Sequence, residues 1–139
     1  MSEENVEVIR RIWSRWEEGP DQGDPGAAWD HGLAAPDATI SPPREVPGWK
    51  LYTGRDGFLE FFDTWTEAFT DFKIWPQRFI DVGDDRVVLI LKQSATGKES
   101  SARVELHFGI VFTLKAGQAT AVEMYITPEQ ALEAVGLSE

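Results

Sequence analysis

The sequence contains no cysteine, only two histidines and no long apolar run. Without a thiol it can form neither disulfides nor thiolate metal sites, and it has no cysteine nucleophile. No stretch reaches the roughly 18 apolar residues that span a membrane as a helix. The residues after Met1 are acidic, whereas a signal peptide begins with basic ones. We therefore expect a cytoplasmic protein without a membrane segment.

Basic side chains are also scarce, because 13 Lys and Arg stand against 24 Asp and Glu, giving a net charge of -11. A surface of this charge repels phosphate backbones and anionic lipids. We therefore expect neither nucleic acid nor a membrane surface as a partner. Two histidines without cysteine make a poor set of metal ligands, so we expect no metal and no other cofactor.

Aromatic residues, by contrast, are abundant, with six Trp, eight Phe and two Tyr. Such side chains gain most from burial, so most of them should lie inside. They either fill the core or wall a cavity, and composition leaves both interpretations open. The length of 139 residues is typical of one domain, and we expect a single domain over residues 1–139.

The strongest periodic pattern lies near the end of the chain, in residues 103–115 and 118–126. Apolar and polar residues alternate there, which predicts strands with one buried face. Residues 72–82 and 86–94 predict two further strands. Asp81, Asp84 and Asp85 lie at their connection, and we interpret them as turn residues rather than cation ligands.

Helical spacing predicts the remaining elements. In residues 3–18, apolar residues recur three or four apart, and a stripe of aromatic residues from Phe58 to Phe69 does the same. Thr127 and Pro128 predict the start of a last helix that ends at Gly136. Residues 37–41 predict a short strand, followed by a loop up to Tyr52. Helices on one face of an antiparallel sheet make an α+β domain.

Several segments together resemble the nuclear-transport-factor-2-like superfamily, and within it the SnoaL-like group of polyketide cyclase relatives. The segments that carry the resemblance are Glu4-Asn5-Val6-Glu7, Pro36-Asp37-Ala38, Tyr52-Thr53-Gly54-Arg55-Asp56-Gly57, Phe79-Ile80-Asp81-Val82-Gly83-Asp84 and Glu129-Gln130-Ala131-Leu132-Glu133-Ala134-Val135-Gly136-Leu137. The resemblance implies a cone-shaped, curved antiparallel sheet wrapped around N-terminal helices, a cystatin-like α+β barrel. It also implies a hydrophobic pocket and, commonly, a homodimer formed through the outer sheet face.

The resemblance does not imply one activity, because the superfamily includes ketosteroid isomerase, epoxide hydrolases, cyclases and dehydratases. Ketosteroid isomerase has a protonated Asp on the strand that matches residues 103–115, and SnoaL-like relatives often have His there. Ile110 is the nearest residue in this chain. Isoleucine neither donates a hydrogen bond nor moves a proton, so that catalytic group is missing.

Candidate site residues fall into three sets. Those expected to wall a pocket, with the loop residues Trp49 and Tyr52 closing it, are Trp13, Trp16, Trp49, Tyr52, Phe61, Trp65, Phe108, Ile110 and Met124. Candidates for a general acid or base are His31, Asp37 and Tyr52. Arg103, Glu105 and His107 lie two apart on the strand face opposite the core. There they form a solvated face, a dimer contact or a site in which the carboxylate orients the imidazole.

Three functions are open at this point. The protein binds a hydrophobic small molecule, or it is a cofactor-independent isomerase, cyclase or hydratase that uses acid-base catalysis, or it is a dimerising structural or interaction module. They differ in what the space between helices and sheet must contain. An enzyme needs an ionisable side chain there, a binding protein needs only volume, and in an interaction module the space can be filled.

Overall fold

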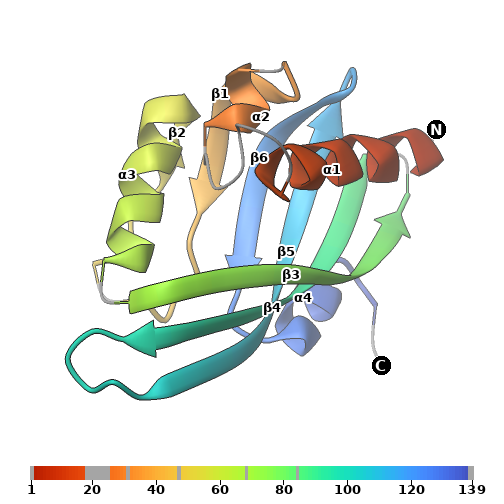
Figure 1. Ribbon diagram of the computed structural model, residues 1–139. Coiled ribbons are helices and arrows are strands. Elements are labelled where there is room, and N and C mark those ends of the chain that lie inside the picture. Colours follow the sequence, from red (N-terminus) through yellow and green to blue (C-terminus); the bar gives the residue numbers. More distant parts are fainter. Residues whose placement is uncertain are drawn as a thin grey trace.

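The computed structural model describes residues 2–17, 26–30, 32–46, 48–67, 69–83 and 85–137. This part of the chain forms four helices and six strands, whose arrangement Figure 1 shows. The helices are α1 (Ser2–Glu17), α2 (Ala27–Asp30), α3 (Gly54–Thr66) and α4 (Pro128–Ala134). The strands are β1 (Ala34–Ser41), β2 (Tyr52–Thr53), β3 (Phe69–Val82), β4 (Arg86–Gly97), β5 (Arg103–Lys115) and β6 (Gln118–Tyr125).

The six strands form one sheet in the order β2-β1-β6-β5-β4-β3. The sheet is strongly curled, and together with the helices it forms the half-barrel of an α+β fold that the sequence predicts. One strand pair differs from the prediction, because β1 runs parallel to β6, with Ile40 beside Val122. The sheet is therefore mixed rather than antiparallel throughout. This pairing joins segments far apart in the sequence, so no local pattern indicates it.

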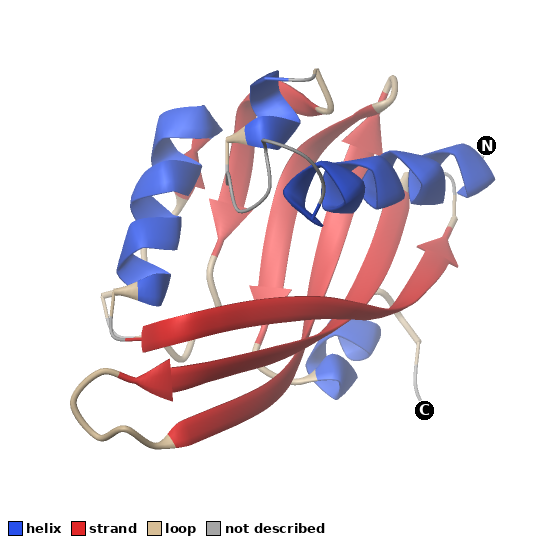
Figure 2. Cartoon of the chain, in the orientation of Figure 1, coloured by secondary structure: helices blue, strands red, loops and turns tan. Residues whose placement is uncertain are grey.

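The helices cover two different faces of the sheet (Figure 2). On the inner face, the α1 residues Val8 and Ile9 pack against alternate β4 residues such as Leu89 and Leu91. Residues in between, such as Val88, face outward. The outer core consists of Val88, Ile90 and Val111 packed against Ala131 and Leu132 of α4 and Val135 just after it. Part of the outer face, which we expected to be exposed or to form a dimer contact, is therefore covered by α4.

Several predicted boundaries shift in the structure. β3 begins at Phe69, because Phe69 pairs with Gly97 of β4, so this residue is not part of the aromatic helix face as predicted. β1 begins at Ala34 rather than at residue 37, and the two-residue strand β2 was predicted as loop. α3 begins at Gly54, whose φ of +72° only glycine adopts readily.

The prediction for the last helix is confirmed. The Thr127 side chain accepts a hydrogen bond of 3.1 Å from the backbone N–H of Gln130, and Pro128 follows as the first helical residue. Gly136, with φ of +82°, lies just beyond the helix end. Among the residues described, no helix is both long enough and apolar enough to cross a membrane.

Candidate functional site

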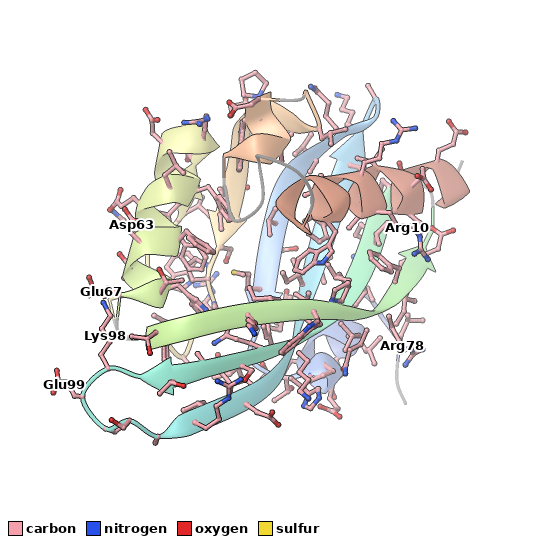
Figure 3. All side chains as sticks on the ribbon, viewed as in Figure 1. Arg10, Asp63, Glu67, Arg78, Lys98 and Glu99 are labelled. Carbon is pink, nitrogen blue, oxygen red and sulfur yellow. The ribbon has the colours of Figure 1, made fainter. Side chains whose placement is uncertain are left out.

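A cavity of about 140 Å³, partly open to solvent, lies between the inner face of the sheet and the helices. Its walls come from α1, α2, α3 and from every strand except β2. Figure 3 shows the side chains that fill the region between α3, α1 and the sheet. Asp63 on α3 and Glu67 just after it, both labelled, point away from this region. The charged face of α3 is thus the solvent face.

The aromatic stripe of α3 forms one wall of the cavity. Phe58, Phe61, Phe62 and Trp65 lie three or four residues apart, so they share one helix face. The ring centroids of Phe61 and Trp65 are 5.6 Å apart, and that of Trp65 lies 6.2 Å from that of Phe108 on β5. These are ordinary distances for packed aromatic pairs. The wall is therefore continuous from the helix to the sheet.

The strands supply the opposite wall through every second residue. Phe108, Ile110 and Phe112 of β5 line the cavity, and so do Val122 and Met124 of β6. Ile110 pairs with Met124 across the two strands, and Phe112 pairs with Val122. Side chains paired across an antiparallel ladder point to the same face. The alternation seen in the sequence thus places one apolar set on the inner face.

The indole N–H groups of two lining tryptophans donate hydrogen bonds within the protein. Trp65 donates its indole N–H to Oε1 of Gln93 over 2.9 Å, and Trp29 donates its own to the backbone oxygen of Ala35 over 3.0 Å. All described residues that line the cavity are Ala, Val, Ile, Leu, Met, Phe or Trp. Within the described part of the chain, no carboxylate, imidazole or hydroxyl lines the cavity.

The structure brings together most, but not all, of the residues expected to wall a pocket. Those that line the cavity are Trp13, Phe61, Trp65, Phe108, Ile110 and Met124. The side chain of Trp16 lies outside what the structure describes. That any of these residues contacts a ligand stays a prediction.

Trp49 and Tyr52 are not among the lining residues. Trp49 donates its indole N–H to the backbone oxygen of Pro42 over 2.8 Å, and the Arg44 guanidinium lies 4.1 Å from its ring centre. Tyr52 packs against Phe61 at 5.6 Å. Neither residue therefore lines the cavity, and their role in closing it stays a prediction.

The candidate acids and bases are not brought together at the cavity. Asp37 is exposed on β1, whereas its neighbour Ala38 is buried and lines the cavity. Tyr52 lies in β2, and Lys50 is 4.8 Å from its ring centre. A hydrogen bond of 2.6 Å to Glu60 raises the pKa of Lys50. His31 lies outside the described residues.

Arg103, Glu105 and His107 are exposed on the outer face, as predicted. Glu105 lies 3.8 Å from the ammonium of Lys92, and Arg103 donates to the hydroxyl of Thr96 over 3.3 Å. His107 pairs with Lys92 across the ladder. Among the described residues, no group of three or more His, Asp or Glu is arranged to hold a metal ion.

A model of the SnoaL-like domain matches residues 9–122 of the sequence. The chain belongs to the SnoaL-like family. A comparison with curated proteins finds no match. Among solved structures, a candidate SnoaL-like polyketide cyclase from Jannaschia sp. CCS1 is similar at 17% identity and a TM-score of 0.71, with 96% of this chain and 92% of that chain covered.

Two further similar structures were determined with small molecules. A protein from Catenulispora acidiphila with a ketosteroid isomerase-like fold, in complex with trimethylamine, has 16% identity and a TM-score of 0.66, covering 94% of this chain and 93% of that one. TerC, co-crystallised with polyporic acid, has 21% identity and a TM-score of 0.65, covering 95% and 97%. At these identities the likeness concerns the fold.

Within this SnoaL-like fold, Ile110 lines the cavity beside its strand partner Met124. The position that sequence reasoning compared with the protonated Asp of ketosteroid isomerase is therefore an apolar part of the wall. Sequence reasoning missed other lining residues. The aromatic stripe already indicated Phe58 and Phe62, and the alternation in the strands already indicated Phe112 and Val122. The sequence did not indicate Trp29, Ala28, Ala34 or Ala38 as lining residues, because α2 and β1 carry no strong period.

Proposed function

We propose that this SnoaL-like protein binds a small hydrophobic molecule, or the hydrophobic end of a larger one, in the cavity between α3 and the sheet. The observation that carries the proposal is a cavity of about 140 Å³ walled only by apolar side chains among the described residues. Apolar cavities of this kind stay dry and gain free energy when an apolar group fills them.

The volume sets the size of the group that enters. An engineered apolar cavity of about 150 Å³ in another protein binds benzene. A cavity of about 140 Å³ therefore suits one six-membered ring or a short branched alkyl group. The similar structures determined with trimethylamine and with polyporic acid support a small-molecule ligand in this fold.

Binding is favoured over acid-base catalysis by the nature of the walls. An isomerase, cyclase or hydratase needs an ionisable group within hydrogen-bond reach of the reacting atoms. None of the described lining residues has one, and Asp37 is exposed on β1. An interaction module needs no cavity, whereas a binding protein does. We therefore propose binding as the function, and a cytoplasmic location stays a prediction from the sequence.

Calorimetric titration with toluene tests this proposal. We expect saturable binding to the wild type and none to Ala38→Leu, because Ala38 is buried in the cavity wall and leucine adds three carbon atoms there. Ala134→Leu makes the same chemical change on an exposed position of α4 and should bind as the wild type does. Equal binding by Ala38→Leu and the wild type would place toluene elsewhere and contradict the proposal.

We also propose that a second copy of the chain contacts the outer face beside Glu105 and His107. Trp75 on this face is 39% exposed, which is unusual for so large an apolar side chain. It lies next to Lys92, whose ammonium is 5.7 Å from the ring centre. Neighbouring cationic and anionic groups, such as Lys92 and Glu105, suit an interface formed by two identical surfaces.

A further inference from the structure

Gln93 is a buried polar residue beside an apolar cavity. It is only 1% exposed, and it lies on β4 between Ile74 of β3 and Leu106 of β5. Among the described residues, the hydrogen-bond partner of its side chain is the indole N–H of Trp65, at 2.9 Å. A buried amide in such surroundings is costly unless its polar atoms are used. The Gln93 oxygen thus accepts a hydrogen bond from Trp65, which offsets the cost of burying it.

Trp65 is a lining residue whose indole N–H has such a partner. It lies in the last turn of α3, which ends at Thr66. Its ring contacts Phe61 on the same helix and Phe108 on β5. Ring contacts of this kind tolerate several orientations, whereas a hydrogen bond of 2.9 Å allows few.

The acceptor is held more firmly than the donor. β4 has hydrogen-bonded strands on both sides, and its pairing with β5 runs without a bulge from Arg86 to Thr96. The Gln93 backbone is therefore fixed, and its side chain is enclosed. Trp29, by comparison, donates to a backbone oxygen, which no side-chain substitution removes. Trp65 is thus a lining indole whose hydrogen bond depends on another side chain.

We propose that Gln93 is a positioning residue that holds the Trp65 indole in place as a wall and so sets the size limit of the cavity. This inference rests on the proposed function, because it concerns the same cavity. With the indole held, the cavity accepts a one-ring compound and rejects a two-ring compound. Without the acceptor, the indole turns and the cavity admits the larger ligand.

The test compares toluene with naphthalene in the wild type and in Gln93→Met, which has a similar length but no hydrogen-bond acceptor of comparable strength. We expect the wild type to prefer toluene by at least about tenfold, because a single extra methylene already costs about that much in a fitted pocket and naphthalene has three more carbon atoms than toluene. In Gln93→Met this preference should fall by about tenfold. Gln93→Glu keeps an oxygen at the same position and should retain the preference.

Two further variants serve as a control and as a second test. Ser94→Ala changes the next residue of β4, whose side chain is equally buried but faces the other side and whose hydroxyl has no described hydrogen-bond partner. This control should bind both ligands as the wild type does. Trp65→Phe removes the hydrogen-bond donor and leaves Gln93 in place, so it should also relax the size limit. It therefore tests the inference if Gln93→Met does not fold.

The NMR resonance of the Trp65 indole N–H tests the role of Gln93 without any ligand. It is identified by its absence in Trp65→Phe, and we expect it to move in Gln93→Met and stay in Ser94→Ala. If neither ligand binds the wild type, the proposed function fails, while the resonance still decides the role of Gln93. An unchanged Trp65 resonance in Gln93→Met, or an unchanged size preference, would overturn the inference.

Discussion

Gly109 of β5 lies directly against Ala131 of α4, so closely that a Cβ added to Gly109 would stand 2.5 Å from the Cβ of Ala131. Such a separation does not occur between real Cβ atoms, so the helix can approach the strand only because residue 109 has no side chain. Around this contact α4 covers Val88, Ile90 and Val111. The pair thus fixes how α4 seals the outer face of the sheet.

Gly109→Ala should therefore destabilise the protein, because α4 would have to move away from a packed core. Overpacking of this kind costs about 1–3 kcal/mol. Ala131→Gly should recover part of the loss in the double variant, although glycine itself weakens a helix. Denaturant unfolding of the four proteins gives the coupling energy. A coupling of zero would show that the two residues do not limit each other.

Thr127→Ala should lower the free energy of unfolding by about 1 kcal/mol, because the hydroxyl caps α4 through the backbone N–H of Gln130. Thr53 provides a matched control. It occupies the same position before α3, but its side chain makes no capping hydrogen bond. Thr53→Ala should therefore cost clearly less. Equal losses in chemical denaturation would mean that the hydroxyl of Thr127 is not what stabilises α4.

Tyr125 gives a prediction at alkaline pH. It lies in a cleft of the outer face that is also lined by Arg44, Glu123 and Gln130. Burial raises the pKa of Tyr125, the charge of Glu123 raises it further, and Arg44 lowers it. The folded state thus favours the neutral phenol. Its contribution to stability is full below the unfolded pKa of about 10 and is lost as the pH rises through the higher folded value.

The measurement uses the tyrosinate absorbance of Tyr52→Phe, which leaves Tyr125 as the only tyrosine. We expect its titration midpoint to fall on unfolding. As the pH rises above about 10, Tyr125→Phe should lose less stability than the wild type. A folded midpoint at or below the unfolded one would contradict the burial of this phenol.

The outer face is tested by sedimentation. If a second copy contacts this face, Glu105→Arg combined with His107→Glu should weaken the dimer, because it reverses charges where the two copies meet. Lys98→Glu combined with Glu99→Arg changes charges at the exposed turn between β4 and β5 and serves as a control. A monomeric wild type, or an unchanged mass of the first variant, would rule out this placement.

Local patterns predicted much of this fold, and the reasons are visible in single elements. The alternation in β5 and the aromatic spacing in α3 report which face is buried, and the structure places Phe108, Phe61 and Trp65 around one cavity. Thr127 and Pro128 predicted the start of α4 because a capping hydrogen bond is formed within four residues. These patterns depend only on neighbouring residues, so the rest of the chain does not alter the structure that they predict.

Features that depend on distant parts of the chain were not predictable in this way. The parallel pairing of Ile40 with Val122 leaves no trace in either segment. Trp49 was expected to close the cavity, but it bonds to the backbone of Pro42. Which of the two positions Trp49 takes depends on the conformation of its loop, and no periodicity in the sequence indicates that conformation. The hydrogen bond between Trp65 and Gln93 likewise becomes visible only when α3 lies on the sheet.

We propose that the cavity between α3 and the sheet takes up a hydrophobic group of about one ring. A crystal structure of the protein soaked with toluene tests this proposal. We expect electron density for one ring among Phe61, Phe108 and Met124, which all line the cavity. An empty cavity at saturating toluene, or toluene bound only at the surface, would contradict it.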